Sequence, residues 1–279
     1  GIIPKTMAEI HPTAILDGNI SLGDGVVVGP QCVLQGDITI GSGTTLIGNV
    51  YLTGTLVMGH RNVVYPFSCI GFAAQDISYP TDAYNPGIVI GDDNIFREGS
   101  TVHRATQKLP TTIGNNNYLM TTTHVGHDCQ IGNNVTLVTD SALGGHVHIM
   151  DKVIVGGASS AHQFVTIGKG AMLAAGILTS YDVLPYFLLT GYNIVGSLNI
   201  IGMRRSGMDA NEITRRKEIF KLLYRSEHSH NKALQILKDQ NDPIALEYVD
   251  AIESSRRGIV PRAIPKRLAR RGATAEADA

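Results

Sequence analysis

Residues 131–149 read IGNNVTLVTDSALGGHVHI, and every sixth residue in this stretch is aliphatic. The same spacing runs from residue 10 to residue 173, with a break at 71–87 and a shift of one residue after Val102. Of the 25 positions in this register, 23 are Ile, Leu, Val or Met. The positions are Ile10, Leu16, Leu22, Val28, Leu34, Ile40, Leu46, Leu52, Met58, Val64, Ile70, Ile90, Phe96, Val102, Ile113, Leu119, Val125, Ile131, Leu137, Leu143, Ile149, Val155, Ala161, Ile167 and Leu173.

A period of six fits neither an α-helix nor a simple strand, whose side chains repeat every 3.6 and 2 residues. It predicts a triangular coil of three short strands, in which each aliphatic side chain points inward. Parallel coils stack about 4.8 Å apart, so about eight or nine coils would form a prism about 40 Å long. Small residues two positions before the aliphatic one, such as Cys32 and Ser141, let the chain turn each corner. We therefore predict a mainly β fold, a parallel β-helix over residues 1–190, in preference to a β-sandwich with accidental spacing.

The C-terminal part differs in both pattern and charge. Residues 1–190 contain 7 Lys and Arg against 13 Asp and Glu, whereas residues 191–279 contain 16 against 11. Asp209 is a suitable N-cap for one helix, and Pro243 fits the first position of a later one. We predict a small α-helical domain over 191–279 that ends in a basic tail. Its positive surface suits an acidic partner.

Composition excludes several classes of protein. The formal net charge of the 279 residues is −1, which argues against nucleic-acid binding. No apolar run is long enough to cross a membrane. Cys32, Cys69 and Cys129 are an odd number without a CxxC motif, which favours a reducing compartment over a disulfide framework. The chain begins GIIPK without an initiator Met, so we expect that a piece before Gly1 is missing.

Histidines gather in one zone of the predicted prism. His127 and His146 are 19 residues apart, about one coil, so they should lie on neighbouring coils near the same edge. Histidine is the natural general base near neutral pH. Asp128 could orient the ring of His127, and Gly145 could offer its N–H to an oxyanion. The other histidines of this zone are His103, His124 and His162.

Each of these residues also has a purely structural interpretation. A single histidine on a solenoid is usually a solvated surface residue, and Asp128 or Gly145 can simply shape a corner. Cys129 stands in a small-residue position, so a packed thiol is favoured over a nucleophile. Several histidines can also bind zinc, but spacing does not establish three converging ring nitrogens.

The stretches THVGHDCQIG (123–132), SALGGH (141–146) and AHQF (161–164) resemble the UDP-N-acetylglucosamine O-acyltransferases, a hexapeptide-repeat family with a left-handed parallel β-helix. The resemblance extends over nearly the whole chain. It implies transfer of an (R)-3-hydroxyacyl group from acyl carrier protein to the 3-hydroxyl of UDP-N-acetylglucosamine, the first step of lipid A biosynthesis. Further matching segments are HPTAI (11–15), IGFAAQD (70–76), TVHRAT (101–106), GGASSAHQF (156–164), RRSG (204–207), KLLYRS (221–226) and SSRRGIV (254–260).

The resemblance also implies a role for individual residues. His127 would be the general base, Asp128 would orient it, Gly145 would donate its N–H to the oxyanion, and Asp76 would hold the sugar. It implies a homotrimer with sites between adjacent prisms, and no metal or cofactor. The basic C-terminal half would meet the acidic carrier protein. The remaining implied substrate-binding residues are His103, His124, His146, His162, Gln163, Asn199 and Arg205, and the implied acyl-chain ruler is Ala175 and Asn193.

The chain departs from the family pattern at four positions. Ser78 stands where bacterial members commonly have Lys, Asn193 where they have His, Ile201 where they have Glu, and Ala175 where a Gly is familiar. These changes concern nucleotide affinity and acyl length rather than the sugar chemistry. Together with the N-terminus they favour the plant organellar branch, and hence a mitochondrial location, over the bacterial cytoplasm.

Three alternative functions stay open. The sister N-acyltransferase of the same pathway normally carries an extra domain before the hexads, which here begin at residue 10. A zinc hydratase resembling the γ-class carbonic anhydrases needs a His pair five residues apart, which is absent around His127. A non-catalytic or ice-binding prism should carry regular Thr ladders, and only the run at 121–123 appears.

Overall fold

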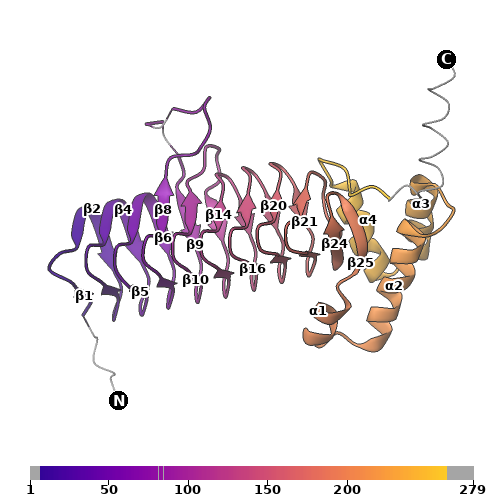
Figure 1. The fold of residues 1–279 in the computed structure, drawn as a ribbon, viewed down its shortest axis with the longest axis horizontal. Helices are drawn as coiled ribbons and strands as arrows, with labels where there is room; N and C mark the ends of the chain where they lie inside the picture. The colour runs from indigo at the N-terminus through magenta and orange to yellow at the C-terminus, as the bar shows by residue number, and fades with distance from the viewer. Residues whose placement is uncertain (1–6, 81, 84, 263–279) are drawn as a thin grey trace.

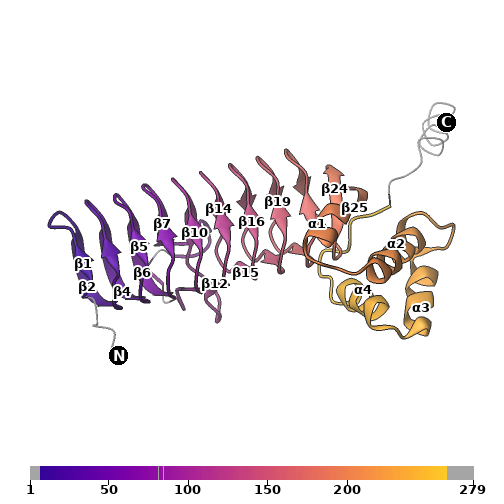
Figure 2. The same ribbon diagram turned by 90° about the horizontal axis from the view of Figure 1, so that it is seen from below.

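The computed structural model describes residues 7–80, 82–83 and 85–262. The molecule is an elongated prism of stacked coils, with helices gathered at its C-terminal end (Figures 1 and 2). Strands on one face form an 11-stranded sheet, and strands on the other two faces form a 14-stranded sheet. The strands of the first face are β1 (Glu9–Ile10), β3 (Val27–Val28), β5 (Thr45–Leu46), β7 (Val63–Val64), β10 (Ile95–Phe96), β13 (Tyr118–Leu119), β16 (Thr136–Leu137), β19 (Ile154–Val155), β22 (Met172–Leu173), β24 (Phe187–Gly191) and β25 (Ile194–Leu198).

The other two faces share continuous strands in the first coils and separate strands later. The continuous strands are β2 (Ile15–Leu22), β4 (Val33–Ile40) and β6 (Tyr51–Met58). The second face continues with β8 (Cys69–Phe72), β11 (Thr101–His103), β14 (His124–Val125), β17 (Ala142–Leu143), β20 (Ser160–Ala161) and β23 (Leu178–Thr179). The third face continues with β9 (Ile88–Ile90), β12 (Thr111–Ile113), β15 (Gln130–Ile131), β18 (His148–Ile149) and β21 (Thr166–Ile167).

The pairing register confirms the predicted coil. Tyr118 pairs in parallel with Thr136, and His124 with Ala142, so one turn of the regular prism takes 18 residues. The predicted inward positions are buried from Val28 to Leu173, which confirms the hexad register over those coils.

The first coil keeps the predicted register, with Ile10 paired to Val28 and Leu16 to Leu34, but its side chains are less buried. Ile10 and Leu16 are 48% and 36% exposed, and Leu22 is only half-buried. An inward side chain is covered by its equivalents on the coils before and after it, and the first coil has a neighbour on one side only. The hexad pattern therefore identifies which way a side chain points, but burial also needs a coil on each side.

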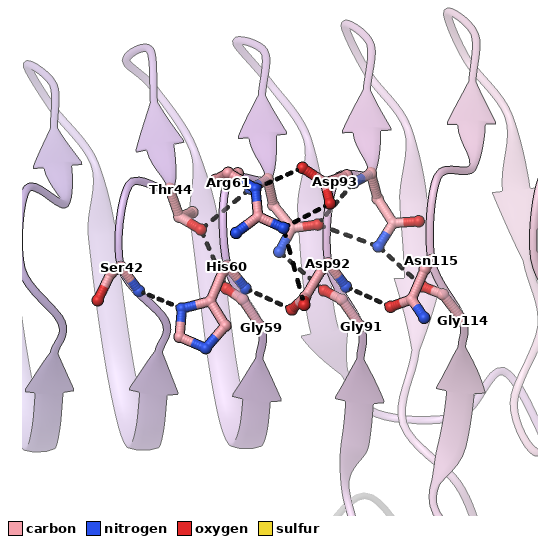
Figure 3. Close-up of polar contacts among 12 residues, drawn as sticks. Ser42, Thr44, Gly59, His60, Arg61, Gly91, Asp92, Asp93, Gly114 and Asn115 are labelled. Atoms are coloured by element: carbon pink, nitrogen blue, oxygen red, sulfur yellow. Dashed lines mark hydrogen bonds and ion pairs between the residues drawn. The ribbon is translucent and has the colours of Figure 1, made fainter.

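Polar side chains connect the coils along the corner between the third and first faces (Figure 3). Inside the corner, the side-chain oxygen of Asn62 accepts the Asn94 N–H at 2.9 Å, and Asn94 accepts the Asn117 N–H at 2.9 Å. Outside it, the Asp92 carboxylate accepts the His60 N–H at 2.7 Å. Turning a corner takes main-chain N–H groups out of the strand ladder, and these side chains supply their acceptors.

The chain leaves the prism through a hairpin and four helices. β24 extends the first face by pairing with β22, and β25 folds back antiparallel to it. The helices are α1 (Ile200–Arg205), α2 (Ala210–Tyr224), α3 (His230–Gln240) and α4 (Pro243–Glu253). Asp209 caps α2 and Asp242 caps α4, whose first residue is Pro243, as predicted. None of the described helices is long and apolar enough to span a membrane.

The hairpin was not predicted, because residues 191–279 were assigned to an α-helical domain and β25 lies within them. β24 spans residue 190, the predicted boundary between the β-helix and the helical domain. That boundary stays a prediction.

A buried arginine fixes the helices to the prism. Arg216 of α2 is 4% exposed, and its guanidinium lies 4.4 Å from the centre of the Tyr186 ring. It pairs with Glu212 at 2.8 Å and Glu247 at 2.7 Å, so its charge is compensated. The Tyr248 hydroxyl of α4 donates to the main-chain carbonyl just before Tyr186, at 3.1 Å.

Replacing Leu137 by Ala tests the coil register. Leu137 is fully buried in the middle of the prism, so the substitution should lower the free energy of unfolding by roughly 2–5 kcal/mol. Denaturant unfolding measures the change. The neighbouring Thr136, which points outward on the same strand, provides the control position, and an equal loss in Thr136→Ala would contradict the register.

Candidate active site

Two loops leave the prism on neighbouring coils, and the longer one, after β8, stands out clearly in Figure 1. These loops, 73–87 and 104–110, are hydrogen bonded to one another. The Arg104 N–H donates to the Phe72 carbonyl at 3.1 Å, and the Ala105 N–H donates to the Gly87 carbonyl at 3.3 Å. His103 adds a bond from its Nδ1 to the Ala73 carbonyl at 2.6 Å.

His127 and Asp128 form a hydrogen-bonded pair at the corner after β14. The Nδ1 atom of His127 lies 2.6 Å from Oδ2 of Asp128. An ionised carboxylate can only accept, so the shared proton belongs to Nδ1, and Nε2 of the neutral ring carries the lone pair. This is the tautomer that a general base needs.

Asp128 is held as an anion although its side chain is only 4% exposed. Burial by itself raises the pKa of this carboxyl group. Hydrogen bonds from His127, Thr106 and Gln107 outweigh burial and lower the pKa to about 2. A negative charge therefore stands beside His127 at every pH near neutrality, where it would stabilise an imidazolium.

A cleft of about 290 Å³ opens beside His127. A Cβ atom on Gly145 would lie 2.5 Å from Nε2 of His127, so only glycine fits against this edge of the ring. The cleft is lined by Gln75, His103, His124, Gly126, His127, Ala142, Leu143, Gly144, Gly145, Ser160, Ala161 and Gln163.

Two further histidines of the cleft, His103 and His124, have lowered pKa values. The rings of His103 and His124 meet edge to face, with centroids 5.2 Å apart. Burial lowers the pKa of both, and with the nearby His103 and His127 it brings that of His124 to about 4. Because a carbonyl oxygen can only accept, the proton of the neutral His103 ring lies on Nδ1 and is donated to the Ala73 carbonyl. Nε2 of His103 can therefore accept a hydrogen bond.

His146 and Asp76 lie beside the pair without lining the cleft. The ring of His146 is 5.1 Å from that of His127, on the next coil as the spacing predicts, and it stacks on Phe164 at 4.4 Å. Burial lowers the pKa of His146, although the Asp128 charge opposes this. The Ser78 hydroxyl donates to the Asp76 carboxylate at 2.7 Å and lowers its pKa, with smaller contributions from His127 and His146.

Five predicted site residues lie outside the cleft of the same chain. His162 is exposed, with Nδ1 3.2 Å from the carbonyl of the next residue. Asn199 caps α1 and donates to the main chain of the last coils, while Arg205 is exposed in the last turn of α1. Ala175 is exposed at a corner. Asn193 lies in the β24–β25 turn, and its side-chain oxygen accepts the Ser180 N–H at 2.8 Å. Asn199, Arg205, Ala175 and Asn193 lie towards the C-terminal end of the prism, whereas His162 stands between the cleft residues Ala161 and Gln163.

The residues that hold Asp128 were not predicted. Thr106 and Gln107 donate three N–H and O–H groups to its carboxylate, and the Thr111 hydroxyl accepts the Asp128 N–H at 2.9 Å. The only available signal was that their loop interrupts the repeat between two histidines.

The pair and His146 form the one group among the described residues that could hold a metal ion, with donor atoms within 4.8 Å of one another. Both oxygens of Asp128 already accept hydrogen bonds. Oδ1 accepts the N–H groups of Thr106 and Gln107, and Oδ2 accepts the Thr106 hydroxyl and the Nδ1 proton of His127. A metal ion would have to displace these donors. The geometry therefore favours proton transfer over metal binding.

Comparisons with known proteins agree with one another. The family described as UDP-N-acetylglucosamine O-acyltransferase, domain 2, matches residues 182–260, and bacterial transferase hexapeptides match residues 110–145. An acyl-[acyl-carrier-protein]–UDP-N-acetylglucosamine O-acyltransferase of Verminephrobacter eiseniae is 42% identical over 84% of this chain and 89% of its own length. The enzyme of that name from Ectopseudomonas mendocina is 41% identical over 91% of this chain and 99% of its own.

Solved structures give the same result. The UDP-N-acetylglucosamine acyltransferase of Francisella novicida superimposes with a TM-score of 0.87 and 34% identity, covering 91% of this chain and 94% of that one. The acyltransferase of the same name from Arabidopsis superimposes with a TM-score of 0.79 and 28% identity, covering 90% of this chain and all of that one.

The lowered pKa values of the buried histidines predict an acid-sensitive fold. The ordinary pKa of histidine is about 6.5, and that of folded His124 is about 4, so between these values the unfolded chain binds more protons. Stability should therefore fall as the pH is lowered through this window. Thermal unfolding between pH 7 and pH 4.5 measures it. In His124→Gln the melting temperature should depend less steeply on pH, and an unchanged slope would contradict the assignment.

Proposed function

This chain belongs to the family of UDP-N-acetylglucosamine O-acyltransferases, and from that premise we propose that His127 is the general base of the transfer. The enzyme transfers an acyl group from acyl carrier protein to UDP-N-acetylglucosamine, the first step of lipid A biosynthesis. We propose that the acyl group is (R)-3-hydroxyacyl and that the acceptor is the 3-hydroxyl of the sugar. The observation that carries the assignment is the bond of 2.6 Å between His127 and Asp128 beside the cleft.

The proposed reaction needs one base and one oxyanion donor. Nε2 of His127 takes the proton of the sugar hydroxyl while the hydroxyl oxygen attacks the thioester carbon. The imidazolium that forms lies against the ionised Asp128, and the tetrahedral oxyanion accepts the N–H of Gly145. When the carbon–sulfur bond breaks, the proton on His127 passes to the departing thiolate of the carrier.

Neutral histidines and an ionised Asp76 would bind the sugar. His103 and His124 line the cleft, and burial lowers the pKa of each, which makes them weaker bases and suits them to neutral hydrogen bonding. Asp76 has one carboxylate oxygen bonded to Ser78. Its other oxygen is in a position to accept a sugar hydroxyl.

We propose that the active assembly is a homotrimer. Asn199, Arg205, Ala175 and Asn193 lie outside the cleft of their own chain, and a neighbouring prism would bring equivalent residues to it. Light scattering of the purified chain tests this proposal, and a mass of one chain would contradict it.

The proposed base is tested by His127→Ala in a transfer assay with UDP-N-acetylglucosamine and 3-hydroxyacyl carrier proteins of several chain lengths. Loss of general base catalysis should lower kcat about 10²–10⁴-fold, while Asp128→Asn should lose less because the base remains. His11→Ala, an exposed histidine on the first coil, is the matched control. Full activity of His127→Ala would exclude the assignment.

If the wild-type protein transfers an acyl group from none of these donors, the sister N-acyltransferase substrates are tested next, and then the zinc hydratase reaction.

We propose that the carrier protein docks on the basic half of the chain, residues 191–279. Salt screens attraction between exposed charges. Raising NaCl from about 0.05 M to about 0.5 M should therefore raise the KM for the acyl carrier protein. A free acyl-pantetheine donor has no acidic protein surface and serves as the control. An equal rise in KM for both donors would refute the docking surface.

A further inference from the structure

The loop 104–110 holds both oxygens of the Asp128 carboxylate. The Thr106 hydroxyl donates to Oδ2 at 2.7 Å, and the Thr106 N–H lies 3.0 Å from Oδ1 and 3.1 Å from Oδ2. The Gln107 N–H donates to Oδ1 at 2.9 Å. The proton of His127 reaches the same Oδ2 atom that accepts the Thr106 hydroxyl.

These hydrogen bonds fix the orientation of the Asp128 carboxylate. The last torsion of an aspartate side chain has broad minima, so a carboxylate without fixed donors samples a wide range of orientations. Two main-chain N–H groups define its plane, and the Thr106 hydroxyl fixes Oδ2 on the side that faces His127. We propose that Thr106 is a positioning residue for acyl transfer, acting on His127 through Asp128. The inference rests on the proposed role of His127.

Thr106 contacts Asp128 rather than the cleft. It is absent from the lining of the cleft beside His127, and its side chain lies against Asp128. The loop is half-exposed to exposed at residues 106–109, so removing one hydroxyl there opens no cavity in the core. The hydrogen bond to Oδ2 gives Thr106 a route to the base through the carboxylate.

The same loop is joined to the one that carries Asp76. The His103 ring and the Arg104 and Ala105 N–H groups bond to carbonyls at the two ends of loop 73–87. Thr106 follows these three residues directly. The proposed sugar-binding loop and the base are thus fixed to one short segment, and Thr106 is its point of contact with the base.

Replacing Thr106 by Val removes the hydroxyl and keeps the shape. Losing a hydrogen bond to a charged group should lower kcat about tenfold and leave the KM of both substrates unchanged. Thr106→Ser keeps the hydroxyl and should restore kcat to near the wild-type value. Thr136→Val, an outward threonine on β16 of the first face, is the matched control and should leave kcat unchanged.

A double-mutant cycle separates positioning from a structural role. In the Asp128→Ala background the carboxylate is gone, so adding Thr106→Val should cause no further loss of kcat. A threonine that merely stabilised the loop would cause the same tenfold loss in both backgrounds. Melting temperatures of all variants show that each one is folded under the assay conditions.

A spectroscopic measurement tests the inference independently of activity. The short bond to Asp128 should give the Nδ1 proton of His127 a low-field NMR resonance, absent in His127→Ala. It should shift or vanish in Thr106→Val but persist in Thr136→Val. An inactive wild type that keeps this behaviour would refute the proposed function and leave the positioning role intact. Unchanged kcat and resonance in Thr106→Val, or a further loss of kcat in the Asp128→Ala background, would overturn the inference.

Discussion

The parallel stacking of coils every 18 residues is the constraint on which the rest of the molecule depends. Each main-chain strand bonds to the coil before and after it, so a residue at a given corner lies over its equivalents along the whole prism. His146 meets His127 for this reason and is followed on the next coil by Phe164, which stacks on it. A site built this way inherits its geometry from the backbone, and the coil that carries His127 is hydrogen bonded to a coil on each side.

The corner geometry also limits which residues suit the positions of Asp128 and His146. Asp128 and His146 have φ angles of 60° and 61°, in the left-handed region that side chains other than glycine seldom adopt. Aspartate tolerates this region better than most residues. The main chain turns there so that the His146 N–H donates to the His127 carbonyl at 2.9 Å. The strain at these corners is distributed along the prism, where equivalent positions such as Asn134 and Lys152 have the same conformation.

Much of the fold could be predicted from the sequence, because each six-residue period corresponds to one face of a coil. It identified the inward side chains, the neighbouring placement of His127 and His146, and the caps of α2 and α4. It failed where contacts depend on something other than the period. Ile10 lacks a covering coil, and the hairpin at 187–198 is stabilised by pairing with β22 rather than by a pattern of its own. Thr106 meets Asp128 across 22 residues through an irregular loop, which no periodicity describes.

The loop 104–110 interrupts the repeat and supplies the hydrogen-bond donors that the buried Asp128 carboxylate needs. A buried carboxylate stays ionised only if several donors satisfy it. At the regular corners the main-chain N–H groups that leave the ladder are already bonded to side chains of the neighbouring coil, such as Asn62 and Asp92. The loop 104–110 is released from the strand ladder, and its N–H groups at Thr106 and Gln107 point at Asp128 instead. The break in the repeat therefore supplies the donors that keep Asp128 ionised, and it lies next to the base.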